Sequence, residues 1–156
     1  MKKCFFIFLY LITTLVSFGQ FTDDFSDGDF VNNPIWMGNI GSFEVDTAFK
    51  LHLNDTIANT SYLSTSSHAI IKGSWEFEIK MQFDPSTSNY AKVYLTSDEQ
   101  DLNGSLNGYF IKIGGESGMI DDVSLYTQNG SSTEKIIDGN DSNKLDKDTK
   151  VGNNYM

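Results

Sequence analysis

The sequence predicts an all-β protein in which antiparallel strands form a two-sheet sandwich. Apolar and polar residues alternate with a period of two over many short segments, which is typical of half-buried antiparallel strands. Loops rich in Gly, Asn, Ser and Asp separate these segments at a spacing of roughly ten residues, as in sandwiches and barrels. No window carries the apolar stripe of an amphipathic helix, and no internal repeat is visible.

The clearest strand is GSWEFEIKMQF at 73–83, and Trp75 is expected in the core because its alternating partners are all apolar. A second segment, AKVYLTS at 91–97, places Lys92, Tyr94 and Thr96 on its polar face. Further strands are expected at 42–46, 49–53, 61–65, 108–114, 122–128 and 134–138. The Asn-Gly pair at 129–130 lies between the last two of these strands and predicts a hairpin.

The last part of the chain, 139–156, differs from the rest because it is polar and shows no closing strand. The sandwich domain is expected at 20–138, followed by a polar tail or by the truncated remainder of the domain. We therefore expect a sandwich that is incomplete at its C-terminus. A naturally short protein with a disordered tail is the alternative.

The first 19 residues have the three parts of a secretory signal peptide. Two lysines precede an apolar run at 4–16, and Ser17 and Gly19 stand at the small-residue positions of a cleavage site before Gln20. The run is shorter than the roughly 20 apolar residues that a membrane span needs. The sequence predicts a secreted or cell-surface protein without a membrane span after cleavage. Its single cysteine, Cys4, would be removed with the leader.

The charge of the chain restricts its partners. The 156 residues have a formal net charge of −10 at pH 7, with 11 lysines, 21 acidic residues and no arginine. Nucleic-acid binders carry basic patches, and recognition of phosphate and carboxylate groups favours the arginine fork. Nucleic acid and anionic membrane are therefore excluded as expected partners, whereas neutral glycans, cations and other proteins remain.

The order of these features resembles a known family. The segments that carry the resemblance are DDFSDGDF with Trp36 after it, the Trp75 strand, PSTSNYAKVYL and NGYFIKIG, and it covers about residues 21–137. The chain resembles the N-terminal concanavalin A-like (laminin-G-like) domain that opens many large secreted proteins of gliding, surface-colonising bacteria. The resemblance implies a jelly-roll-like sandwich, often followed by lamin-tail, immunoglobulin-like or sorting domains. It implies fold and context rather than a site.

No complete catalytic motif is present. Laminarinase-type glycoside hydrolases on this fold carry E-x-D-x-x-E or E-x-D-x-E on one strand, because alternate carboxylates project into one cleft. Glu44 and Asp46 match the first two positions, but Ala48 and Phe49 stand where the last glutamate should be. The two histidines of the chain, His52 and His68, lack a triad or metal motif. The sequence therefore predicts no enzyme.

A structural calcium ion is the only cofactor for which the sequence offers candidate ligands. Calcium takes six to eight oxygen ligands, and acidic clusters at 23–29, 98–101 and 138–148 offer carboxylates. The best candidates are Asp24, Asp27 and Asp29, with other loops completing the site. Ordinary solvated turns rich in Asp and Gly are the alternative for each cluster.

Aromatic side chains next to polar loops suggest carbohydrate binding. The available ones are Trp36, Tyr62, Tyr90, Tyr94, Tyr109 and Tyr126. Trp36, Tyr94 and Tyr126 are the predicted ligand-binding residues, although packing is the favoured role of Trp36. A tyrosine pair on one sheet face would suit a sugar ring or a neighbouring domain. The expected function is binding or adhesion by a secreted noncatalytic module, with a carbohydrate as the favoured ligand. A hydrolase fragment and a spacer are the alternatives.

Overall fold

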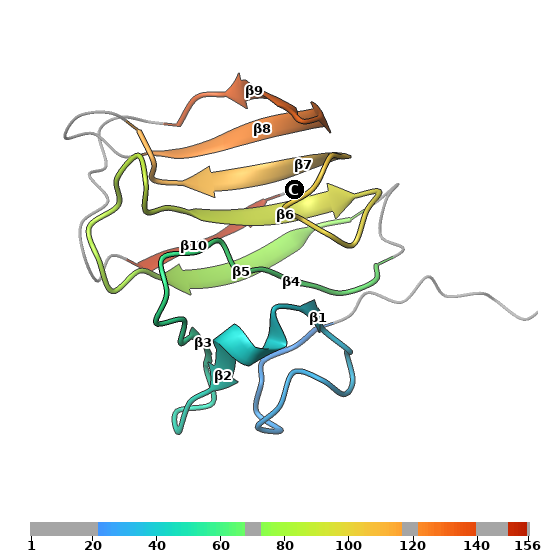
Figure 1. The fold of residues 1–156 in the computed structure, drawn as a ribbon, viewed down its shortest axis with the longest axis vertical. Coiled ribbons are helices and arrows are strands. Elements are labelled where there is room, and N and C mark those ends of the chain that lie inside the picture. Colours follow the sequence, from blue (N-terminus) through green and yellow to red (C-terminus); the bar gives the residue numbers. More distant parts are fainter. Residues whose placement is uncertain (1–21, 68–72, 117–121, 140–149, 156) are drawn as a thin grey trace, which may run out of the picture.

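The computed structural model describes residues 22–67, 73–116, 122–139 and 150–155, the last range for its backbone only. Its largest element is a four-stranded antiparallel sheet in the order β6-β7-β8-β9 (Figure 1). These strands are β6 (Ala91–Ser97), β7 (Leu106–Ile113), β8 (Val123–Gly130) and β9 (Ser132–Ile137). Each pairs with the strand next to it in sequence, so the sheet is a meander of hairpins.

A second layer covers the inner face of this sheet. Strand β5 (Trp75–Lys80) pairs antiparallel with β10 (Lys150–Tyr155), which lies behind the four-stranded sheet in Figure 1. Side chains from both layers form the core, which is centred on Met81, Ile111 and Ile113. Phe77 and Ile79 reach this core from β5 because alternate residues of a strand share a face. The described chain is thus all-β, with antiparallel sheets packed in the manner of a sandwich.

The N-terminal part forms two small antiparallel pairs at the other end of the molecule (Figure 1). Strand β1 (Met37–Gly38) pairs with β4 (Leu63–Ser64), and β2 (Phe43–Val45) pairs with β3 (Leu51–Leu53). A 3₁₀ turn, η1 (Ile40–Ser42), precedes β2 and is the only helical element among the residues described. In those residues no helix has the length and apolar character needed to cross a membrane.

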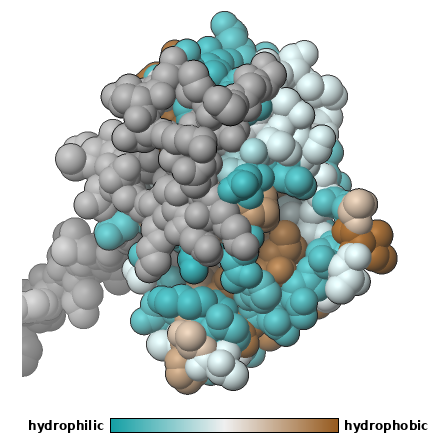
Figure 2. All heavy atoms as spheres, turned by 90° about the vertical axis from the view of Figure 1, so that its left-hand side faces the viewer, coloured by the Kyte–Doolittle hydropathy of each residue, from teal (hydrophilic) through white to brown (hydrophobic). Residues whose placement is uncertain are grey.

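Hydrophobic residues also reach the surface. Figure 2 shows the side of the molecule that lies at the left of Figure 1. On its described surface, hydrophobic residues appear in small separate areas bordered by hydrophilic ones. In the described chain as a whole, the exposed large hydrophobic side chains include the loop residues Ile35, Ile57 and Phe83. Scattered exposure of this kind is ordinary for a folded domain.

The predicted hairpin between the last two strands of the meander is confirmed, with the turn one residue later than the Asn-Gly pair suggests. Asn129 pairs with Ser132, so the two loop residues are Gly130 and Ser131. Gly130 has φ +62°, the left-handed conformation that a II′ turn requires at its first position.

Two predictions about strands are wrong. The prediction of a tail without a closing strand fails because β10 pairs with β5 over six residues, from Lys150 opposite Lys80 to Tyr155 opposite Trp75. The prediction that Thr96 lies on the polar face fails because the register of β6 shifts between Tyr94 and Thr96. A bulge of this kind inserts one extra residue and reverses the faces beyond it.

Trp75 is half-buried rather than enclosed in the core. It lines a cavity of about 300 Å³ at the edge of the core together with Leu95, Thr96, Tyr109 and Leu125. Leu95, which lies within the register shift, and Thr96, which follows it, therefore both face this cavity.

Candidate binding face

The outer face of the four-stranded sheet carries a row of aromatic side chains. Tyr94 in β6, Phe110 in β7 and Tyr126 in β8 are register partners, so alternation places all three on this face. The ring centroids of Tyr94 and Phe110 lie 5.0 Å apart, and those of Phe110 and Tyr126 lie 5.2 Å apart in a stacked arrangement. The structure thus brings together two of the three aromatic residues that the sequence singled out.

Phe110 is the centre of this row and is almost completely buried, with 1% of its surface exposed. Three lysines lie among the aromatic rings. Lys92 Nζ lies 4.7 Å from the centroid of Phe110, and Lys112 Nζ lies 4.7 Å from that of Tyr90. Ammonium groups at such distances are attracted to ring faces, and their aliphatic stems cover apolar surface.

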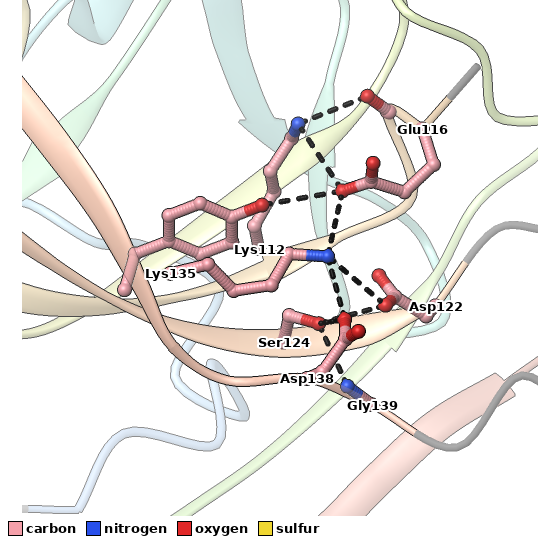
Figure 3. A network of polar contacts seen from close by, with 9 residues as sticks. Lys112, Glu116, Asp122, Ser124, Lys135, Asp138 and Gly139 are labelled. Carbon is pink, nitrogen blue, oxygen red and sulfur yellow. Dashed lines mark hydrogen bonds and ion pairs between the residues drawn. The ribbon is translucent and has the colours of Figure 1, made fainter.

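One end of the outer face is held by a network of carboxylates around Lys135 (Figure 3). Lys135 Nζ lies 2.6 Å from Asp138 Oδ1, 3.3 Å from Glu116 Oε1 and 3.5 Å from Asp122 Oδ2. Asp138 is the main cause of a raised pKa of Lys135, and the same contact lowers the pKa of Asp138. The ammonium therefore pairs with three carboxylates, from Glu116 after β7, Asp122 directly before β8 and Asp138 directly after β9.

The network continues through neutral donors. The Ser124 hydroxyl donates to Asp122 Oδ2 at 2.8 Å, and the Gly139 amide donates to Ser124 Oγ at 2.9 Å. Tyr126 is tied in through its hydroxyl, which donates to Glu116 Oε1 at 3.2 Å. Burial is the main cause of a raised pKa of Tyr126. Tyr126 is thus part of the network at this end of the outer face. It is not among the lining residues of the cavity next to Trp75 or of the polar pocket described next.

A polar pocket of about 400 Å³ lies on the outer face, between Tyr90 and the loop that joins β6 and β7. Its lining consists of Thr60, Tyr90, Lys92, Tyr94, Leu102, Asn103, Gly104, Ser105, Gln128, Ser131 and Thr133. The sheet forms the floor, and the loop between β6 and β7 forms one wall. Hydroxyl, amide and phenol groups next to aromatic rings are the groups that bind sugar hydroxyls and sugar rings.

Tyr94 is held in place in this pocket. Its hydroxyl donates to Gln128 Oε1 at 2.6 Å, and Gln128 Nε2 donates to the carbonyls of Gly130 at 2.9 Å and Gly104 at 3.3 Å. The buried glutamine therefore fixes both the phenol and the wall loop. Burial raises the pKa of Tyr94, so its hydroxyl stays protonated and keeps lone pairs that can accept a hydrogen bond.

Trp36 directly precedes β1, which lies apart from the four-stranded sheet in Figure 1. Its indole N–H donates to Asp23 Oδ2 at 2.7 Å, and its ring lies 6.4 Å from that of Phe25. These contacts give Trp36 a packing role that holds the first described residues. The structure does not bring it together with Tyr94 and Tyr126.

The candidate calcium ligands have local partners. Asp24 Oδ1 accepts the Ser26 amide at 3.0 Å, Asp27 Oδ1 accepts the Asp29 amide at 3.2 Å, and Asp29 Oδ1 accepts two amides at 2.8 Å. Among the described residues, no three His, Cys, Asp or Glu side chains are grouped so as to hold a metal ion. The geometry supports turn capping by these aspartates. Calcium binding stays a prediction, and a melting temperature equal in calcium and in chelator would overturn it.

The partial hydrolase signature has similar local roles. Asp46 Oδ1 accepts the amides of Ala48 at 2.8 Å and Lys50 at 2.9 Å, which closes the β2–β3 turn. Glu44 Oε1 lies 3.4 Å from His52 Nδ1 across the same hairpin. The third acidic cluster, at 138–148, falls almost entirely outside the described residues.

No family model, no curated protein and no solved structure matches the chain significantly. The functional argument therefore rests on the outer face itself. The residues there that were not predicted as site residues include Tyr90, Lys92, Phe110 and Gln128. The sequence contains a signal for the first two, because Tyr90 and Lys92 alternate with Tyr94 and must share its face.

Proposed function

We propose that the chain is a secreted, noncatalytic sandwich module that binds carbohydrate in the polar pocket on its outer face. The leader-like first 19 residues support secretion, and the resemblance to concanavalin A-like domains of surface proteins supports a place at the front of a larger extracellular protein. The observation that carries the proposal is the pocket lined by Tyr90, Tyr94 and Gln128.

The pocket suits a sugar because its groups are fixed before a ligand arrives. Gln128 holds Tyr94, and Lys112 Nζ lies over Tyr90 while donating to the Gly115 carbonyl at 2.9 Å. Gly115, at φ +84°, lets Tyr90 pack directly on the backbone, since a Cβ there would lie 2.9 Å from the Tyr90 ring. Preorganised rings and polar groups lower the entropic cost of binding. The described residues of the pocket lining include no carboxylate, which fits binding better than glycoside hydrolysis.

Replacing Tyr90 by alanine is expected to weaken glycan binding about tenfold or more, because the pocket loses one of its two aromatic walls. Tyr90 is 41% exposed, so the fold should tolerate the change. Binding is measured first on a glycan array and then by titration calorimetry with the best-bound oligosaccharide.

The matched control is Tyr109→Ala, since Tyr109 is 50% exposed and lies outside this pocket. It should bind glycan like the unchanged protein. Equal losses in both variants would remove the pocket from the proposal. If the unchanged protein binds no glycan, with or without calcium, the carbohydrate function is wrong and a spacer role takes its place.

A further inference from the structure

The three lysines of the outer face differ in their charge partners. Lys135 pairs with three carboxylates, and Lys112 lies 3.9 Å from Glu116 Oε1 (Figure 3). Lys92 forms no ion pair with the carboxylates of the residues that the structure describes. Its contacts there are with rings, 4.7 Å from the centroid of Phe110 and 6.0 Å from that of Tyr94.

Among the residues that the structure describes, Lys92 is also the only charged one in the lining of the polar pocket. This is unusual for a chain with 21 acidic residues and 11 lysines. The described lining offers this ammonium only neutral polar groups, aromatic rings and Leu102. The pocket therefore has a local positive charge in a protein of net charge −10.

We propose that the pocket selects acidic sugars, and that Lys92 pairs with the carboxylate of a uronic acid unit or with a sugar sulfate. The inference rests on the proposed carbohydrate function and gives it a ligand class. Lysine suits this role because its ammonium is a compact point charge. The hydroxyls of the same sugar would bind Tyr94 and the Ser, Thr and Asn side chains of the pocket.

The charge environment of Lys92 supports this assignment. Burial and, second, the neighbouring Lys112 lower the pKa of Lys92. An anion next to Lys92 would offset the repulsion between the two ammonium groups. The attraction between Lys92 and an anion a few ångströms away is only weakly screened by salt. The repulsion between an acidic polymer and the protein's distant carboxylates is screened beyond about 8–10 Å at physiological salt.

The test compares neutral oligosaccharides with their counterparts of the same linkage that carry C6 carboxylates or sulfate esters. The full chain is expected to bind at least one acidic series about tenfold more tightly than the neutral parent. The two acidic series distinguish a uronate from a sulfate ligand.

The variants Lys92→Gln and Lys50→Gln each remove one positive charge, but Lys50 is exposed in the β2–β3 turn, outside the pocket. K92Q should lose about tenfold in affinity for the acidic series, and K50Q should lose less than about twofold. If K92Q folds poorly, K92R is measured in its place, and it should retain binding because it keeps the positive charge. Equal binding of neutral and acidic sugars, or equal losses in K92Q and K50Q, would overturn the inference and leave the carbohydrate function standing. Binding of no sugar in any series would overturn the carbohydrate function itself.

Discussion

Replacing Phe110 by alanine is expected to lower the free energy of unfolding by about 3–4 kcal/mol. Phe110 is 1% exposed, although it lies on the outer face of the sheet. Tyr94 and Tyr126 flank its ring at centroid distances of 5.0 and 5.2 Å, and Lys92 lies over it. Removing the ring leaves a cavity that the fixed neighbours cannot fill. Urea unfolding followed by circular dichroism measures the loss.

Phe83→Ala is the matched control, because Phe83 is 42% exposed and follows β5 in a loop. Its replacement should cost less than about 1 kcal/mol. If both variants lower the free energy of unfolding by the same amount, Phe110 does not stabilise the outer face as a buried side chain. A stable F110A protein that still binds sugar normally would also contradict the supporting role given to this ring.

Replacing Lys135 by methionine is expected to lower the free energy of unfolding by about 2–3 kcal/mol. The change leaves Asp122, which is 4% exposed, without its ammonium partner. Breaking a fully buried pair costs about 3–5 kcal/mol, and the value here is lower because the lysine is partly exposed. Thermal and urea unfolding measure the effect. Lys50→Met, at an exposed position, should change stability by less than about 0.5 kcal/mol.

A second substitution tests the cause. Adding Asp122→Asn to K135M removes the unpaired buried charge while keeping an oxygen that can accept from Ser124. The double variant should therefore be more stable than K135M alone. If it is less stable, the loss in K135M comes from packing of the lysine stem and not from the uncompensated carboxylate.

The clearest strands could be predicted because alternation of apolar and polar residues over a short segment indicates a half-buried strand. The alternation in 91–97 gives β6 with its observed bounds, and 73–83 contains all of β5. The bulge near Leu95 could not be predicted, since it depends on the register with β7. Strand β10 was missed because its residues carry little apolar signal and it forms by pairing with β5.

The site could be predicted only in part. Tyr94 and Tyr126 follow from alternation, but the sequence does not show that Phe110 joins them into one row. Whole-chain charge left neutral glycans, cations and other proteins as partners, and it does not show local charges because it averages over the surface. The structure separates Lys112 and Lys135, which have carboxylate partners, from Lys92 in the pocket. The role of Trp36 depends on its distant partner Asp23, which no local pattern indicates.

The location of sugar binding is tested most directly by a titration of isotope-labelled protein with the best-bound oligosaccharide, followed through backbone amide shifts in NMR. We expect shifts at 90–94, in the wall loop 102–105 and around Gln128, with none at 23–36. Shifts confined to the segment around Trp36, or saturation of binding without any change at the outer face, would contradict this expectation.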